Sequence, residues 1–356
     1  MRTAFVKPHF LLYAGLLVAS SAQADFNAGV AAYKRGEFAA AATAFQTEAE
    51  AGGARAQFAL GLLYDNGEGV TKNDATAADW YRRSAEQNYA KAQVNLALMY
   101  QSGRGIEADP KQAAAWLLRA AEQGNADAIA RYRQIAEQGD NEAQSKLGAM
   151  YFYGRGVTRD NTQAAEWFRR AAESGNALAM CNLGALYERG TGDPRAPQKA
   201  ISWYEKAAAA GYAPANYNLA RLYLFGTGVP LNAELARQHL EQAATAGVSR
   251  AQLLLAMQFE RGQHWAKDLA AARQWYERAA VTGEVDAQLN LAYLYALGEG
   301  IPRDRLTAYA WYLVAKDSGS KLAEENLGAL APVLSREQIA TAEQTAAGLR
   351  EKLKKP

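Results

Sequence analysis

Cysteine and histidine are scarce in this sequence of 356 residues, which contains one cysteine and three histidines. The single cysteine, Cys181, cannot form an intramolecular disulfide. The histidines have no Cys or His partner at the spacing of a metal site, so we expect no metal and no other cofactor. Stability must therefore come from packing.

Clustered charge and long apolar runs are missing as well. The 39 Lys and Arg and the 37 Asp and Glu residues give a formal charge of +2, and both signs are interspersed along the chain. A nucleic-acid surface needs basic side chains gathered on one face, so we expect no nucleic-acid partner. Beyond the N-terminal signal no segment resembles a membrane span, so we expect no transmembrane segment in the mature chain.

The first residues have the pattern of an export signal. Residues 1–24 contain its three parts: a basic start at Arg2 and Lys7, an apolar run over 10–19, and the cleavage motif Ala22-Gln23-Ala24. The apolar run is shorter than the roughly 20 residues that cross a bilayer as a helix. We therefore expect cleavage after Ala24 and a periplasmic or secreted protein.

The mature chain is dominated by one repeated pattern, Ala-x3-Leu-(Gly/Ala)-x2-Tyr. Its starting residues are Ala56, Ala92, Ala143, Ala179, Ala215, Ala251, Ala287 and, in partial form, Ala323. Six of the seven spacings between these alanines are 36 residues, and the spacing after Ala92 is 51. The pattern predicts seven full repeats, a partial eighth and an insert of 15 residues.

Each repeat predicts two helices joined by a glycine loop. The Ala, Leu and Tyr of the pattern lie four residues apart and so share one face of the first helix. The loop has two glycines one residue apart, at Gly67/Gly69, Gly103/Gly105, Gly154/Gly156, Gly190/Gly192, Gly226/Gly228 and Gly298/Gly300. A capping residue opens the second helix at Asn73, Asp109, Asp160, Asn232, Asp268 and Asp304, with Ala196 as the exception.

A single hairpin of this kind cannot bury its apolar face, so the hairpins must stack into a solenoid. The recurring tryptophans are expected in the core between helices: Trp80, Trp116, Trp167, Trp203, Trp275 and Trp311. The predicted organisation is a signal (1–24), an N-terminal capping hairpin (25–52), repeats 1 and 2 (53–127), a truncated repeat that breaks the superhelical phase (128–142), repeats 3 to 7 (143–322), and a partial repeat with a C-terminal capping helix (323–356). Ser335 and Gln338 form the capping box of that last helix.

The stretch 143–175, which reads AQSKLGAMYFYGRGVTRDNTQAAEWFRRAAESG, resembles the Sel-one-like repeat (SLR) family, relatives of the tetratricopeptide repeat. The resemblance covers about residues 26–354. It implies an all-α, right-handed superhelical solenoid of antiparallel helix pairs whose first helices line a concave surface. It also implies a role as an adaptor or scaffold in cell-envelope or signalling assemblies.

Several residues that could carry chemistry are better explained by packing. His239 replaces a repeat tryptophan, Trp265 replaces the Val or Ile that plugs the loop, and Cys181 lies near the core face of a first helix, so none of them indicates a site. His264 is interpreted as a packing or surface residue. Ser318 and Lys321 form Ser-x-x-Lys, but the other motifs of penicillin-recognising enzymes are missing. We expect no enzyme, and a hydrolase of the β-lactamase type is the weakest alternative.

The informative residues are those on first helices that the core does not require. Transferring the tetratricopeptide groove to this register selects positions −1, +2, +6, +9 and +10 from each starting Ala. In repeats 1 and 2 they include the mixed set Arg55, Phe58, Asp65, Asn66, Lys91 and Gln101. In repeats 3 to 7 they include Phe152, Tyr153, Tyr217, Arg221, Leu224, Phe225, Met257, Arg261, Tyr293 and Leu297.

Aromatic residues and Met with scattered Arg are typical of protein-interface cores. The sequence therefore favours a monomeric periplasmic scaffold that holds a peptide or a partner protein in its concave groove. Two alternatives stay open. The protein could be a secreted factor that binds a host protein, and a tightly wound superhelix could bury some of these rings between repeats.

Overall fold

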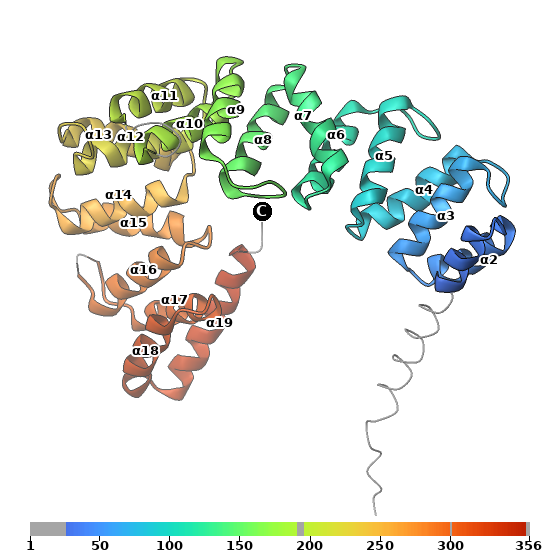
Figure 1. Cartoon of the computed structure of the whole chain (residues 1–356). Helices are drawn as coiled ribbons and strands as arrows, with labels where there is room; N and C mark the ends of the chain where they lie inside the picture. Colours follow the sequence, from blue (N-terminus) through green and yellow to red (C-terminus); the bar gives the residue numbers. More distant parts are fainter. Residues whose placement is uncertain (1–25, 191–195, 300, 354–356) are drawn as a thin grey trace, which may run out of the picture. The chain divides into compact units, whose positions relative to one another are not determined.

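The computed structural model describes residues 26–190, 196–299 and 301–353, and every regular element in them is helical (Figure 1). A helix over residues 26–34 comes first. The α-helices that follow are α2 (Phe38–Glu50), α3 (Ala54–Asn66), α4 (Asp74–Glu86), α5 (Ala90–Ser102), α6 (Pro110–Glu122), α7 (Ala126–Glu137), α8 (Asn141–Tyr153), α9 (Asn161–Glu173), α10 (Ala177–Arg189), α11 (Pro197–Ala209), α12 (Ala213–Phe225), α13 (Ala233–Thr245), α14 (Ser249–Arg261), α15 (Leu269–Ala280), α16 (Val285–Leu297), α17 (Arg305–Asp317), α18 (Lys321–Leu330) and α19 (Arg336–Leu353). The short 3₁₀ helix η1 (Ala331–Val333) follows α18. The predicted export signal lies outside the described residues.

The ends of the helices follow the local sequence signals. The first helices of all seven repeats end at a glycine in the left-handed conformation, as at Gly103 with φ 68°. The predicted caps Asn73, Asp109, Asp160, Asn232, Asp268 and Asp304 all accept a backbone N–H bond, and Ala196 does not. The capping box of α19 is formed as well, because Ser335 and Gln338 exchange hydrogen bonds of 2.8 and 3.2 Å. Gly192 and Gly300 lie outside the described residues.

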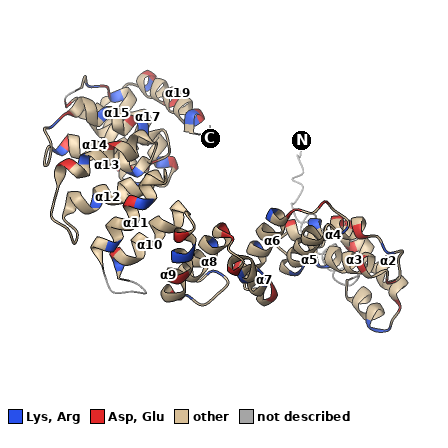
Figure 2. Ribbon diagram, turned by 90° about the horizontal axis from the view of Figure 1, so that it is seen from above, with Lys and Arg blue, Asp and Glu red and all other residues tan. Residues whose placement is uncertain are grey.

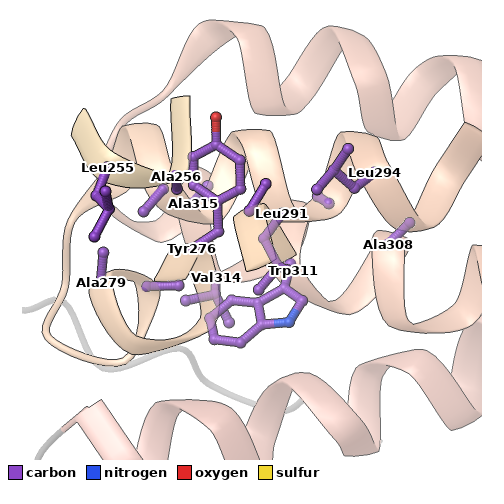
Figure 3. Close-up of a cluster of buried hydrophobic side chains, with 14 of the residues drawn as sticks. Leu255, Ala256, Tyr276, Ala279, Leu291, Leu294, Ala308, Trp311, Val314 and Ala315 are labelled. Atoms are coloured by element: carbon purple, nitrogen blue, oxygen red, sulfur yellow. The ribbon is translucent and has the colours of Figure 1, made fainter. Parts of the chain in front are cut away.

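The chain divides into two compact units, an N-terminal unit that ends at Ser174 and a C-terminal unit that begins at Gly175. In each unit helices adjacent in sequence pack against each other, as expected for a solenoid of hairpins. The interior of the C-terminal unit shows how. Tyr276 of α15 is fully buried between Leu255 of the preceding first helix and Leu291 of the next, with Trp311 close by (Figure 3). Each hairpin therefore supplies part of its neighbour's core.

The tryptophan prediction holds for most repeats. Trp80, Trp116, Trp167 and Trp311 are at most 9% exposed, whereas Trp203 and Trp275 are half-buried. Five of the six carry a Lys or Arg three residues later, whose charged group lies over the indole at 4.2–4.7 Å. One face of the ring is thus packed in the core while the edge that meets solvent is covered by a cation.

A buried glutamine joins consecutive hairpins, and the sequence pattern did not reveal it. The residue after the starting Ala is Gln in five repeats, and its side chain donates to the carbonyl of an Ala eight residues earlier, near the end of the preceding helix. The bonds run from Gln57, Gln93, Gln144, Gln252 and Gln288 at 2.9–3.1 Å. Each of these helix-end carbonyls also accepts a backbone N–H of its own turn, so the buried amide adds a second bond that ties the turn to the next helix.

The 15-residue insert (128–142), predicted as a truncated repeat, contains most of a single helix, α7. It packs against α6 on one side and against α8 on the other. Its buried residues Ala128, Tyr132 and Ala136 have the spacing of Ala77, Tyr81 and Ala85 in a second helix. The insert therefore contributes one helix, built like a second helix. The break in superhelical phase stays a prediction.

The glycine loops change sides at α7. A side chain at Gly105 would clash with the backbone of Asp74, the first residue of the preceding second helix α4. A side chain at Gly156 would instead clash with the carbonyl of Ala121, near the end of α6. The loops of repeats 1 and 2 thus lie at one edge of the N-terminal unit, and the loop of repeat 3 lies at the opposite edge.

Candidate protein-interaction surface

The first helices of repeats 5 to 7 present three matching columns of side chains. Positions +2, +6 and +10 are four residues apart, so they lie on one face of each helix. We call the nine residues the interaction stripe: Tyr217, Arg221 and Phe225 on α12; Leu253, Met257 and Arg261 on α14; and Leu289, Tyr293 and Leu297 on α16. All nine belong to the C-terminal unit.

In each of the three helices the side chain at position +10 is more exposed than the one at position +2. Tyr217 and Met257, like Leu253 and Leu289, are half-buried and pack against the core. Tyr293 is 49% exposed, and at position +10 Phe225 is 57% and Leu297 37% exposed. Burial of these side chains between repeats is therefore wrong for position +10 of α12 and α16. The side chains nearest the start of each helix thus pack against the core and are only partly exposed.

Leu224 corrects the prediction for position +9. Its side chain is only 1% exposed, so it belongs to the interior and offers no contact to a partner. The reason is packing across the hairpin, because position +9 faces the second helix of its own repeat. The same position carries Glu188 and Glu260, which accept hydrogen bonds from the buried Tyr204 and Tyr276 at 2.9 and 2.5 Å.

These carboxylate–tyrosine pairs are fixed by further contacts. Burial, followed by the nearby Glu188 carboxylate, raises the pKa of Tyr204 above its ordinary value, so the phenol remains a hydrogen-bond donor. Arg221 forms an ion pair with Glu188, whose side chain is only 13% exposed. Arg221 thus links α12 to α10, and part of its charge is neutralised within the protein.

Repeat 3 contributes two predicted residues in the N-terminal unit. Tyr153 is 63% exposed, and Phe152 is half-buried with its ring 4.9 Å from that of Tyr153 in an edge-to-face arrangement. Arg155 lies over the Tyr153 ring at 5.2 Å. These two residues form an aromatic corner separate from the interaction stripe.

Two exposed residues were missing from the list of predicted groove residues although the same register points to them. Leu178 and Leu322 occupy position −1 of α10 and α18 and are 39% and 52% exposed. A count of every residue at the five groove positions would have found both. They extend the apolar surface of the C-terminal unit at the opposite ends of its first helices.

The remaining candidates behave as packing residues. Cys181 is 6% exposed, and burial raises the pKa of its thiol to about 11, which disfavours the reactive thiolate. His239 stacks on Tyr223, and Trp265 donates to the carbonyl of Ala233 at 3.2 Å as a larger plug. Ser318 caps the end of α17 on an exposed turn.

Two hollows accompany these surfaces. The first hollow has a volume of about 690 Å³ and lies in the N-terminal unit at the start of α6. The repeat 3 loop does not cover this helix start, because it lies at the opposite edge. Leu118, Ile135 and Lys146 line the hollow. The second, of about 640 Å³ in the C-terminal unit, is bounded by Arg237, Phe259 and residues 266–270. The hollow in the N-terminal unit is more enclosed than the one in the C-terminal unit.

Within the described residues no cluster of three or more His, Cys, Asp or Glu side chains could hold a metal ion. In the same part of the chain, no helix is both long and apolar enough to cross a membrane. Lys, Arg, Asp and Glu are intermixed over the helices of each unit (Figure 2). Neither sign of charge is thus gathered on one group of helices in the part of the chain that the structure describes.

The stacked hairpins, the glycine loops and the non-core columns define a class, the helical-hairpin repeat proteins. More narrowly, the Sel1 repeat family matches seven segments: 54–89, 90–125, 141–176, 177–212, 213–248, 249–280 and 285–320. The chain belongs to this family. Sel1 repeat proteins are generally scaffolds for protein–protein interaction and are typically not enzymes.

Solved structures agree with this assignment. The chain is 35% identical to a protective antigen of uropathogenic Escherichia coli strains with an SLR fold, covering 95% of this chain and 70% of that one at a TM-score of 0.51. It is 29% identical to a Sel1 repeat protein from Oxalobacter formigenes, covering 93% and 97% of the two chains at a TM-score of 0.55. No curated protein matches the sequence.

Proposed function

We propose that this chain is an exported, periplasmic scaffold that binds a peptide or a partner protein through the interaction stripe, in the concave groove of its solenoid. The N-terminal signal pattern supports export, and the family supports a binding role. The site is assigned to the C-terminal unit, because its first helices carry most of the exposed apolar side chains.

One observation carries this proposal. Ten large hydrophobic side chains are exposed in the described residues, and six of them lie on first helices at groove positions: Tyr153, Leu178, Phe225, Tyr293, Leu297 and Leu322. Five positions of a 36-residue repeat thus hold more than half of them. Exposed apolar side chains gathered in this way are typical of a surface that another protein covers.

Capture of envelope proteins by the purified chain tests this function. Phe225→Ala with Leu297→Ala removes two exposed side chains, so we expect weaker capture at nearly unchanged helicity and melting. This pair is preferable to one that includes Tyr217, because Tyr217 also packs against the core. Asn66→Ala with Ser102→Ala alters position +10 of repeats 1 and 2 and is the matched control. Equal loss of capture in both variants would contradict the assignment to the C-terminal unit.

A second candidate, a secreted factor that binds a host protein, uses the same surface in another compartment. Its support is the similarity to a relative described as a protective antigen of uropathogenic strains. Separate assays of the periplasm and the culture medium for the protein distinguish the two candidates.

A further inference from the structure

The glycine-loop ends of the C-terminal first helices carry an alternation that the repeated core does not require. At position +10 the residue is Arg189 in α10, Phe225 in α12, Arg261 in α14 and Leu297 in α16. All four are exposed. A core constraint acts on every repeat alike, so an alternation between neighbouring repeats points to the surface and its ligand.

In repeats 5 to 7 a loop residue packs beside the end of the first helix, six residues after position +10. This loop residue is apolar in repeat 5 and basic in repeat 6, just as position +10 is. Leu231 packs against Gly226, next to Phe225, and is 55% exposed. Lys267 packs against Gly262, next to Arg261, and is exposed as well. One apolar pair and one cationic pair therefore lie on adjacent repeats. Leu297 with Arg303 follows them, where the Arg303 Nε donates to the Leu297 carbonyl at 3.0 Å.

The acidic side chains next to Arg261 and Lys267 in the sequence are already engaged. Glu260 precedes Arg261 but accepts the hydrogen bond from Tyr276, and Asp268 caps α15 through the backbone N–H of Ala271. Among the described residues neither Arg261 nor Lys267 has an ion-pair partner. Glu299 is exposed in the last loop and lowers the positive charge at its Arg303 end. The centre of the row is thus a cation pair between apolar neighbours.

We propose that this row, which consists of Phe225, Leu231, Arg261, Lys267 and Leu297, binds an extended peptide segment with one acidic residue between two apolar ones. Charge complementarity to Arg261 and Lys267 selects the acid, and the flanking leucines and Phe225 select the apolar residues. This inference rests on the proposed scaffold function and names its ligand class.

The spacing of the helices sets the spacing of the ligand. First helices of neighbouring repeats touch through their side chains, as Arg221 of α12 does with Glu188 of α10, so their axes lie about 10 Å apart. An extended chain advances about 3.3 Å per residue. Three residues of peptide therefore span one repeat, which gives the ligand pattern apolar-x-x-acidic-x-x-apolar. A helical ligand would need about seven residues for the same distance.

Fluorescence anisotropy with the purified full chain tests the inference. The probe is a labelled Phe-x-x-Asp-x-x-Leu peptide with serine at each x. We expect binding that weakens as salt is raised, and about tenfold weaker binding of the same peptide with Lys for Asp. Arg261→Glu with Lys267→Glu should reverse that preference. The matched control in repeat 1, Asn66→Glu with Lys72→Glu, should leave it unchanged.

Four outcomes would overturn the inference: no binding of the Asp peptide at millimolar concentration, equal binding of the Asp and Lys peptides, an unreversed preference, or tighter binding of a peptide with seven-residue spacing. Binding of the unchanged chain and of the Arg261→Glu/Lys267→Glu variant to phosphatidylglycerol vesicles is measured in parallel. If the variant loses vesicle binding but keeps its preference between the peptides, the cations belong to a lipid-binding surface. If the partner captured from the envelope is lost in Phe225→Ala/Leu297→Ala but retained in the charge-reversal variant, the scaffold function stands and the acidic ligand fails.

Discussion

The two units of this protein share their hairpins and differ in the side chains that the hairpins display. At position +10 the N-terminal unit has Asn66, Ser102 and Tyr153, whereas the C-terminal unit has Arg189, Phe225, Arg261 and Leu297. Their interiors are alike, because Asp65 accepts from Tyr81 at 3.2 Å as Glu188 accepts from Tyr204. The comparison teaches that one core can carry a largely polar edge in one unit and an edge of exposed apolar and basic side chains in the other.

The largest expected effect separates the stability of the two units. Gly156 has φ 69°, and an added Cβ would collide with the Ala121 carbonyl, so Gly156→Ala should destabilise the N-terminal unit by about 3 kcal/mol or more. Urea unfolding with thiol labelling of Cys181 checks this, because Cys181 reports only on the C-terminal unit. We expect the label to enter at the same urea concentration as in the unchanged protein.

Gly139→Ala is the control for this prediction. Gly139 also has a positive φ, 99°, but open space surrounds its Cβ position. The substitution should cost only the strain of a left-handed residue, about 1–2 kcal/mol. Equal destabilisation by both substitutions would show that the contact between the repeat 3 loop and α6 is loose.

A moderate effect tests whether the two interiors are equivalent. Arg104 pairs with Asp65 in the N-terminal unit, and Arg221 pairs with Glu188 in the C-terminal unit, and both carboxylates are 13% exposed. Replacing either arginine by Ala leaves a mostly buried carboxylate with one tyrosine donor. We expect each variant to lose about 1 kcal/mol, since both guanidinium groups reach solvent.

Urea denaturation of the two arginine variants provides the measurement. Arg131→Ala removes an exposed ion pair with Asp127 on α7 and should cost about 0.3–0.5 kcal/mol. A loss for Arg104→Ala or Arg221→Ala no larger than this control would show that the buried carboxylate does not depend on its arginine.

An effect of similar size, confined to alkaline pH, comes from the thiol of the C-terminal unit. Burial raises the pKa of the Cys181 thiol from its ordinary value of 9.0 to about 11, so the folded state keeps a proton that the unfolded chain releases. The stability from this group is complete below pH 9 and is lost as the pH rises toward 11. Between pH 8 and 10 we expect the unchanged protein to lose roughly 1 kcal/mol more than Cys181→Ser.

Thermal melting at the two pH values measures that difference. The serine hydroxyl does not titrate and can still accept from Asn218, as the Cys181 sulfur does at 3.3 Å. Parallel loss of stability in both proteins would show that the tyrosines, rather than the thiol, control the alkaline range.

The sequence predicted the features that neighbouring residues determine. Caps such as Asp109 and left-handed glycines such as Gly103 depend on a few adjacent residues. Their pattern therefore predicts where the helices of each hairpin begin and end. The five groove positions were also informative, because the exposed Phe225 and Leu297 lie there. The fold class and the family follow from this recurrence.

The errors concern contacts between helices. Leu224 was predicted on the surface, but its position faces a second helix, as the bond between Glu260 and Tyr276 shows. The glutamine bonds, such as Gln93 to the Ala85 carbonyl, join residues that the repeat pattern treats as ordinary polar positions. No single helix contains the information for these contacts, since they depend on how successive helices pack.

The lone helix α7 shows that the edge at which a loop of the N-terminal unit lies depends on whether an odd or an even number of helices is inserted before it. Adding or deleting a complete hairpin changes the helix count by two, so every later loop would stay at its edge. An odd helix exchanges the edges, as the positions of Gly105 and Gly156 demonstrate. Within the N-terminal unit, growth by whole repeats is therefore neutral for the edge at which the loops lie, while the gain of a second lone helix would return the loops to the original edge.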